Sequence, residues 1–171
     1  DENTFAPVYY LTEDADNDDI TIITVSEPQY GSIEDNIYTP DAGFSGSDLY
    51  VYQAYDGALY SNQASVNFNV IDVNDPPVAL NDTINVPEDT SGVIVNVQGN
   101  DNDIDGDPLT TTIIGGPTSG GSATVVNGDS LSYSPPANFV GVDTISYMVC
   151  DTAIVPLCDT AIVFITVNPV N

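Results

Sequence analysis

The chain contains the stretch Tyr133-Ser-Pro135-Pro-Ala-Asn-Phe139-Val-Gly141-Val-Asp143-Thr-Ile-Ser-Tyr147. This stretch indicates the fold, because its pattern occurs twice in the chain. The earlier copy is Tyr38-Thr-Pro40-Asp-Ala-Gly-Phe44-Ser-Gly46-Ser-Asp48-Leu-Tyr-Val-Tyr52. Both copies read Y-x-P-x3-F-x-G-x-D-x3-Y without a gap. An internal repeat of this kind predicts one structural unit that is built twice.

The sequences on both sides of the motif also match, and they occur in the same order. Upstream, Asp14-Ala-Asp16-Asn-Asp18-Asp-Ile20-Thr21 aligns with Asp103-Ile-Asp105-Gly-Asp107-Pro-Leu109-Thr110. Downstream, Ala64-Ser-Val66-Asn-Phe68-Asn-Val70 aligns with Ala161-Ile-Val163-Phe-Ile165-Thr-Val167. Between the halves, the prolines and turn formers of Asp72-Val-Asn-Asp75-Pro-Pro77 cannot continue a sheet ladder. We therefore predict two domains, residues 1–75 and residues 76–171.

Each half has the pattern of short β-strands. Val66, Phe68 and Val70 alternate with two asparagines, which is typical of a half-buried strand. Gly, Pro, Asn and Asp clusters interrupt the apolar runs at about the 8–12-residue spacing of an all-β sandwich. The sequence thus predicts an all-β protein with two tandem immunoglobulin-like β-sandwich domains.

The two halves differ at their beginnings. Domain two has a leading segment, Pro77 to Pro87, that is predicted to be its first strand, and Glu88-Asp-Thr90 follows it. The chain itself begins at Asp1-Glu-Asn-Thr4, which matches only the end of that segment. Domain one is therefore expected to lack its first strand. Either the sequence is cut from a longer array, or a neighbouring molecule supplies the strand and subunits assemble by strand addition.

The composition excludes several classes of function. The 171 residues contain no Lys, Arg or His and 26 Asp and Glu, which gives a formal net charge of −26. Without cationic side chains the chain is not expected to bind nucleic acid or anionic lipid. Without His it has no Ser-His-Asp or Cys-His catalytic site and no His-ligated metal. It has no apolar run of about 20 residues for membrane insertion. Apolar residues make up 42% of the chain, so it is expected to fold, and its carboxylates need an external cation.

An acidic loop in domain two has the spacing of a calcium ligand set. Asp101, Asp103, Asp105 and Asp107 stand at alternate positions with Gly106 between the last two, as in the first half of a calcium loop. An EF-hand is excluded because the twelfth loop position is Thr112 and strands flank the loop. The alternative is a solvated Asp-rich turn. Domain one has the weaker counterpart Asp14, Asp16 and Asp18.

The linker contains a third group of oxygen ligands. Asp72, Asn74 and Asp75 precede the domain that carries the Asp101–Asp107 loop, so the two groups are expected to cooperate. The alternative is an ordinary polar hinge.

The linker D-x-N-D-x-P resembles the inter-repeat calcium motif of cadherins. Ala54-Tyr-Asp56-Gly57 is similar to the cadherin A-x-D-G element, Asp101-x-Asp103 to the D-x-D of the following repeat, and Glu2 and Glu88 to the Glu at the base of the first strand. The resemblance implies one Ca²⁺ cluster in the linker, built from Glu2, Asp72, the Asn74 carbonyl, Asp75, Asp101 and Asp103. It also places Asp151 at this linker and Asp56 at an upstream one. The cadherin L-D-R-E element is absent, and Asp48 and Asp143 stand nearby as substitutes.

A more specific resemblance covers most of the chain. The pattern P-P-V-A-x-N-D…E-D-T…N-D-x-D-x-D-G-D-x-L-T, followed by the repeated motif and C-D-T-A, is similar to cadherin-like repeats of large Bacteroidota adhesins, including gliding-motility adhesins. The resemblance implies a structural segment of a calcium-stiffened adhesin or surface filament at the cell surface. Its partners would be neighbouring repeats of the same chain or identical subunits.

The same resemblance implies O-glycosylation at Asp-Ser/Thr-apolar triplets. The alternative is that Asp ends a turn and Thr begins a strand. The candidate acceptors are Thr83, Ser130, Thr144, Thr152 and Thr160.

The two cysteines occur only in domain two. Cys150 and Cys158 flank the loop between its last two predicted strands, and their domain-one counterparts are Tyr55 and Ser61. A disulfide across the mouth of a hairpin fits this spacing, and it implies an oxidising compartment outside the cytoplasm. A metal site is the alternative, but it would lack further Cys or His ligands.

Two other classes of function are compatible with single features. Tyrosines such as Tyr9 and Tyr60 could stack on glycans or contact a protein partner. Paired carboxylates could serve a glycosidase. However, they have calcium-like spacing and the small sandwiches offer no deep pocket, so we expect no enzymatic activity.

Overall fold

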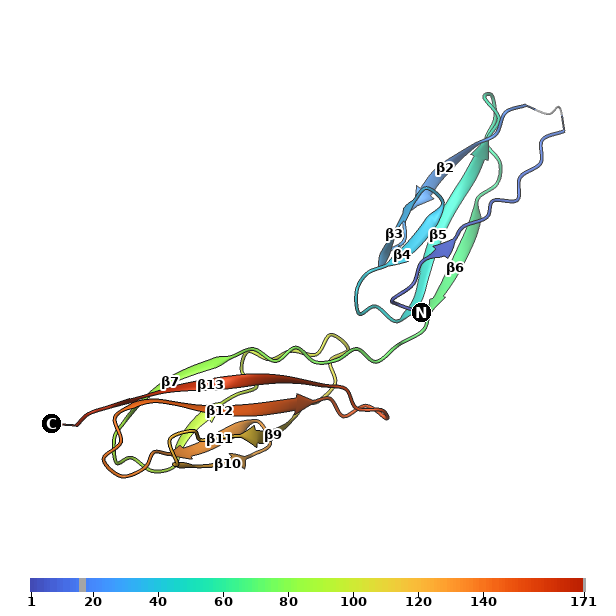
Figure 1. Ribbon diagram of the computed structural model, residues 1–171. Coiled ribbons are helices and arrows are strands. Elements are labelled where there is room, and N and C mark those ends of the chain that lie inside the picture. The colour runs from blue at the N-terminus through green and yellow to red at the C-terminus, as the bar shows by residue number, and fades with distance from the viewer. Residues whose placement is uncertain (16–17, 171) are drawn as a thin grey trace. The chain divides into compact units, whose positions relative to one another are not determined.

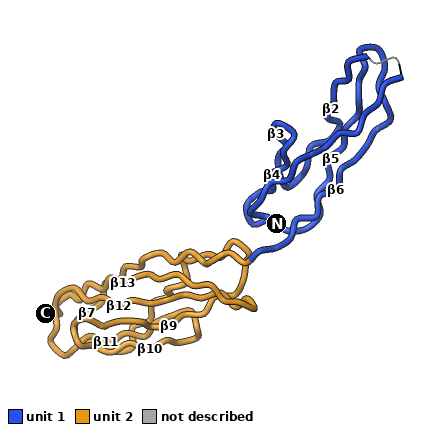
Figure 2. Tube along the Cα trace, turned by 45° about the vertical axis from the view of Figure 1, so that its right-hand side comes forward, with its two compact units in different colours: residues 1–73 blue, residues 74–171 orange. Residues whose placement is uncertain are grey.

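The computed structural model describes residues 1–15 and 18–170. It divides the chain into two compact units, Asp1–Val73 and Asn74–Asn171 (Figure 2). None of the described residues forms a helix long and apolar enough to cross a membrane.

Unit 1 is built from two three-stranded sheets (Figure 1). The first sheet has the order β1-β4-β3, with strands β1 (Ala6–Pro7), β4 (Ile37–Pro40) and β3 (Gly31–Glu34). The second has the order β2-β5-β6, with strands β2 (Thr21–Ser26), β5 (Gly46–Tyr55) and β6 (Ala64–Val70). All neighbouring strands in both sheets are antiparallel.

Unit 2 repeats this arrangement with one additional strand. Its first sheet has the order β10-β11-β8, with β10 (Ser122–Val126), β11 (Ser130–Ser134) and β8 (Val93–Asn96). Its second has the order β7-β13-β12-β9, with β7 (Asp82–Pro87), β13 (Cys158–Asn168), β12 (Gly141–Cys150) and β9 (Thr110–Gly115). The predicted all-β fold with two immunoglobulin-like sandwiches is confirmed.

The additional strand β7 lies beside β13 and is the one parallel pairing in unit 2's second sheet, with Ile84 opposite Ile165 and Val86 opposite Val167. The counterpart of β13 in unit 1 is β6, which pairs with β5 on one side. Among the described residues no strand pairs with the other side of β6. Among the described residues β6 therefore lies at the end of its sheet, whereas β13 lies between β7 and β12.

The repeated motif joins the two sheets in each unit through a tyrosine and an aspartate. The Tyr38 hydroxyl donates to Asp48 Oδ2 at 3.0 Å, and the Tyr133 hydroxyl donates to Asp143 Oδ2 at 2.7 Å. All four side chains are buried. Each tyrosine lies in a strand of one sheet, and its aspartate lies near the start of the long strand of the other sheet. The hydrogen bond between them therefore links the two sheets, which explains why both residues occur in both copies of the motif.

These aspartates are saturated by protein donors. Asp143 accepts further hydrogen bonds from the Ser119 backbone and hydroxyl and from Thr118 and Thr144. Asp48 accepts from three backbone N–H groups as well as from Tyr38. The expectation that Asp48 and Asp143 substitute for metal ligands is therefore wrong, because their lone pairs are used inside the sandwich.

The cores of the two units differ in extent. In unit 2 the inward side chains of β12 and β13, such as Ile145, Tyr147 and Val163, are completely buried. In unit 1 the buried cluster of described residues consists of Val8, Tyr38 and Val70, with half-buried side chains packed against it, and Tyr50 is buried as well.

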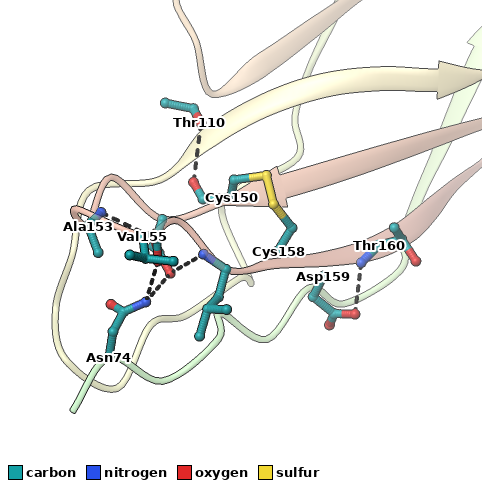
Figure 3. Close-up of a disulfide and its surroundings, with 10 residues drawn as sticks. Asn74, Thr110, Cys150, Ala153, Val155, Cys158, Asp159 and Thr160 are labelled. Atoms are coloured by element: carbon teal, nitrogen blue, oxygen red, sulfur yellow. Dashed lines mark hydrogen bonds between the residues drawn. A yellow bond between two sulfur atoms is a disulfide. The ribbon is translucent and has the colours of Figure 1, made fainter.

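A disulfide joins Cys150 at the end of β12 to Cys158 at the start of β13 (Figure 3). These residues are directly opposite each other in the β12–β13 ladder. The bridge therefore closes the hairpin at the base of the Asp151–Leu157 loop, as the sequence predicted.

Candidate metal centre

The acidic loop of unit 2 is organised around Asp103. Asp103 Oδ1 accepts the backbone N–H groups of Asp105 and Asp107, at 3.0 and 3.4 Å. The Gly106 N–H donates to the Asp103 carbonyl at 3.3 Å, and Gly106 has a φ of +77°. The glycine is needed there because side-chain-bearing residues rarely adopt positive φ. One oxygen of Asp103 thus shapes the loop.

The second oxygens of this loop have no protein partner. Asp103 Oδ2 and Asp105 Oδ1 are buried, and neither has a hydrogen-bond partner among the described residues. Asp103 is only 8% exposed. An ionised carboxylate buried without a compensating group is strongly unfavourable. Because the chain contains no Lys, Arg or His, a bound cation is the compensation that this donor set fits.

The start of unit 2 is held against the same loops. The Asp75 N–H donates to Asp105 Oδ2 at 2.7 Å. The Asn74 amide donates to Asp151 Oδ2 at 3.0 Å and to the Val155 carbonyl at 3.3 Å (Figure 3). The last two residues of the D-x-N-D element, Asn74 and Asp75, are thereby tied to two loops of unit 2.

Asp151, which accepts the Asn74 amide, is almost completely buried, and only 2% of its surface is exposed. Desolvation opposes its ionisation, but hydrogen bonds from the Asn74 amide and the Leu157 and Ala153 backbone N–H groups outweigh that effect and lower its pKa. Asp151 is therefore an anion at neutral pH, next to the segment that begins unit 2.

Asp101 belongs to a different set of contacts. It accepts the Leu80 N–H at 2.8 Å, and the Tyr147 hydroxyl lies 3.4 Å from both of its oxygens. The same hydroxyl is 3.0 Å from Asp82 Oδ2. Desolvation, reinforced by neighbouring carboxylates, raises the pKa of both Asp82 and Asp101. Asp101 is thus hydrogen-bonded to Leu80 and Tyr147, beside the start of β7.

The end of unit 1 brings together two of the predicted ligands. Glu2 and Asp72 each offer a carboxylate oxygen within 4.8 Å of the other. The Glu2 N–H donates to the Ile71 carbonyl at 3.2 Å, and Glu2 Oε1 accepts the Val73 N–H. Glu2 Oε2 is buried and has no hydrogen-bond partner among the described residues.

Glu88 repeats the backbone contacts of Glu2 in unit 2. Its N–H donates to the Asn168 carbonyl at 2.7 Å, and its Oε1 accepts the Val170 N–H at 2.9 Å. This glutamate therefore also closes the end of the last strand, a structural role that spacing alone did not reveal. The sequence did contain a signal for this role, because both glutamates stand at the same place in the repeat.

The predicted site of unit 1 lies at the opposite end of its strands. The Asp18 N–H donates to Asp14 Oδ1 at 3.1 Å, which repeats the contact between Asp107 and Asp103. Asp14 and Asp56 line one cavity of about 150 Å³. Asp16 falls outside the described residues.

Within each unit, no three described acidic side chains place oxygens within 4.8 Å of one another. Each unit by itself therefore offers its acidic ligands in smaller groups.

The chain matches the family model described as "Bacterial Ig domain" over residues 1–69 and again over residues 74–166. This chain belongs to the bacterial Ig domain family. The two matches fall on the two compact units, so each unit is one such domain. No curated protein matches the chain.

Solved cadherin structures share the fold of these bacterial Ig domains. Human CDH23 EC21-23 is 13% identical with a TM-score of 0.58, covering 98% of this chain and 70% of that one. Human protocadherin-24 EC1-2 is 17% identical with a TM-score of 0.54, covering 96% and 90%.

An endo-fucoidan hydrolase of glycoside hydrolase family 107 also matches, with 20% identity over 91% of this chain and a TM-score of 0.45, or 0.44 for its H294Q form. This chain spans only 24% of its length.

The predicted glycosylation sites of the second Ig domain differ in accessibility. Thr83, Thr152 and Thr160 are exposed, and Thr144 is half-buried. Ser130 is 6% exposed and its hydroxyl donates to Asp129 Oδ1 at 2.7 Å. The Ser130 hydroxyl is therefore not presented to solvent in the folded domain, unlike the threonines of the other triplets.

Proposed function

We propose that this tandem of bacterial Ig domains is a structural segment of an extracellular surface protein, and that Ca²⁺ stiffens its linker. One observation carries the proposal: Asp103 and Asp105 each bury a carboxylate oxygen without a partner, in a chain that has no cationic side chain. The disulfide adds support for an oxidising, extracytoplasmic location.

The ligands that we assign to Ca²⁺ belong to two short stretches of chain and one glutamate. Asp103 and Asp105 supply carboxylates in unit 2, and Glu2 and Asp72 supply carboxylates in unit 1. Asp72, Val73, Asn74 and Asp75 follow one another in the sequence. Oxygen ligands on both sides of Val73 would therefore restrict rotation in the linker when they hold one or more ions. Bound metal would make the chain a stiff spacer within an adhesin or filament.

Calcium titration of the chelator-treated chain tests the proposal. We expect saturable binding by calorimetry, with dissociation constants of about 10⁻⁴–10⁻³ M, as in extracellular calcium modules. Asp103→Asn should weaken the affinity at least tenfold. Asn keeps the acceptor that Asp105 and Asp107 need, so the loop itself should persist. Asp41→Asn removes the same charge from an exposed position and is the matched control.

Thermal unfolding gives a second readout, because the effect of Asp103→Asn on the melting temperature should reverse its sign between chelator and calcium. In chelator, Asp103→Asn should melt at the same or a higher temperature than the unmodified chain, because an unpaired buried charge is removed. In millimolar calcium it should melt at a lower temperature. Absence of saturable binding, or identical melting curves with calcium and with chelator, would refute the proposal.

A further inference from the structure

Three exposed asparagines have a left-handed backbone conformation, and one of them differs from the others in the residue that follows it. Asn36, Asn127 and Asn138 have φ values of 63°, 56° and 55°. Gly128 follows Asn127 and completes the one Asn-Gly pair of the sequence. A branched and an aromatic residue follow the other two asparagines. Because exposure and backbone conformation are shared, the following residue is what distinguishes Asn127.

Asn127 and Gly128 lie in the exposed turn between β10 and β11, where Gly128 has a φ of +85°. No atom lies within 4 Å of the position that a Cβ of Gly128 would occupy. Among the described residues, neither the Asn127 side chain nor the Gly128 N–H takes part in a hydrogen bond. The side-chain amide carbon of Asn127 and the backbone nitrogen of Gly128 are therefore both accessible for reaction.

Hydrogen bonds to two carbonyls hold this turn in place. The Gly128 carbonyl accepts the Thr111 N–H at 3.2 Å and Gln98 Nε2 at 3.1 Å. The Asp129 carbonyl accepts the N–H groups of Val97 and Gln98 at 3.1 and 3.3 Å. Thr111 belongs to β9 of the second sheet, whereas the turn belongs to the first. The turn is therefore a point at which the two sheets of unit 2 are joined.

We propose that Asn127 is a site of spontaneous deamidation and isoaspartate formation, controlled by the hydrogen bonds to the Gly128 carbonyl. The Gly128 nitrogen attacks the side-chain carbonyl carbon of Asn127, and its proton leaves with the amide nitrogen as ammonia. The product is a cyclic imide. Water opens this ring at either of its two carbonyls and gives aspartate or isoaspartate. Glycine favours the attack because no side chain shields its nitrogen and its backbone rotates freely.

The attack requires the turn to open, because the Gly128 nitrogen must rotate to face the Asn127 side chain. Opening moves Gly128 away from the two donors to its carbonyl, so these hydrogen bonds oppose the reaction in the folded domain. Isoaspartate would keep the turn displaced, since its main chain runs through the side-chain carbon and is one methylene longer. Aspartate would add the same negative charge without lengthening the main chain.

Incubation of the full chain at pH 8, followed by peptide mass spectrometry, tests the proposal. We expect Asn127 to deamidate at least tenfold faster than Asn36 and Asn138, and to take up heavy oxygen from labelled water. Gln98→Ala should accelerate the reaction at Asn127 at least threefold, because it removes one donor to the Gly128 carbonyl. Asn138 lies in the same unit and is the control for general unfolding. Equal rates at the three asparagines, or an unchanged rate in Gln98→Ala, would overturn the proposal.

A matched variant separates the effect of the added methylene from that of the added charge. Asn127→Asp gains the charge alone, so unit 2 should keep its melting temperature. The isoaspartyl chain, purified by chromatography, should melt at a lower temperature and exchange the Thr111 amide hydrogen at least tenfold faster, because that amide donates to Gly128. Identical melting and exchange in the isoaspartyl chain and in Asn127→Asp would overturn the inference that this modification loosens the joint between the sheets.

Discussion

Asp143 shows how this chain accommodates a fully buried carboxylate without any cationic side chain. Burial alone would raise its pKa, but hydrogen bonds from Ser119, Tyr133 and Thr118 outweigh that effect and lower the pKa to about 2. The same contact, together with desolvation, raises the pKa of Tyr133 to about 12. The pair is therefore a carboxylate and a neutral phenol at any physiological pH.

Replacing this carboxylate should be costly. We expect Asp143→Ala to lower the free energy of unfolding by about 3 kcal/mol, because it leaves several buried donors unpaired. Tyr133→Phe should lower it by about 1 kcal/mol. Urea denaturation at pH 7 measures both changes, with Asp41→Ala as an exposed control.

The pH dependence of this effect has a defined sign. The folded pKa lies below the value of about 3.9 expected in the unfolded chain. The stabilisation is therefore complete above about pH 4 and is lost as the pH falls toward 2. In Asp143→Asn the slope of stability against pH should be smaller in that range. An unchanged slope would show that other carboxylates cause the acid unfolding.

Asp101 and Asp82 have the opposite behaviour, because desolvation raises the pKa of each. A raised folded pKa gives stability below the unfolded pKa that is lost as the pH rises through the folded value. Asp101→Asn should therefore stabilise unit 2 at pH 7, by about 1 kcal/mol or less. Denaturation at pH 4 and pH 7 checks this expectation. The calcium affinity should stay within about threefold of the original, and a loss as large as that of Asp103→Asn would make Asp101 a metal ligand after all.

The β12–β13 hairpin is the element whose stability depends most on a covalent bond, because the Cys150–Cys158 disulfide closes it. The disulfide joins residues eight apart in sequence. Cys150→Ser with Cys158→Ser should lower the stability of unit 2 by about 2–3 kcal/mol, mainly through the entropy of the unfolded chain. Unit 1 serves as the internal control, since Tyr55 and Ser61 occupy the equivalent positions. Hydrogen exchange resolved by residue would separate the two units, and equal losses in both would contradict a local effect.

Strand positions could be predicted from the sequence because period-two alternation and turn residues are local signals. Val66, Phe68 and Val70 do lie on one strand, and in each unit the repeated motif spans two strands that belong to different sheets. The roles of Asp48 and Asp143 could not be predicted in this way, because their tyrosine partners are brought close only by packing one sheet on the other.

The contacts of Asp101 could not be predicted for a similar reason. Alternate spacing suggested one loop from Asp101 to Asp107, but Asn102 pairs with Val78 in an isolated bridge. The chain is still extended at that point, so Asp101 bonds with Leu80 near β7 while the turn begins at Asp103. The spacing of Asp103, Asp105 and Gly106 was informative because the turn needs a positive φ at Gly106, which glycine adopts readily.

At the scale of the whole molecule, the net charge of −26 is the property that the proposed function must explain. Self-repulsion among carboxylates opposes compaction unless counter-ions relieve it. Asp103, Asp105 and Glu2 each bury an oxygen that has no hydrogen-bond partner among the described residues, so we expect a specific cation to stabilise the fold most at these positions. Simple screening by salt acts on exposed charges and would not replace such an ion.

We propose that calcium couples the two bacterial Ig domains through their linker. Residual dipolar couplings measured for both units of one chain, with calcium and then with chelator, test this coupling. We expect the two units to share one alignment tensor in calcium and to show different tensor magnitudes in chelator. We also expect Asp103→Asn to resemble the chelated chain in both conditions. Tensors that do not respond to calcium would show that calcium does not couple the domains.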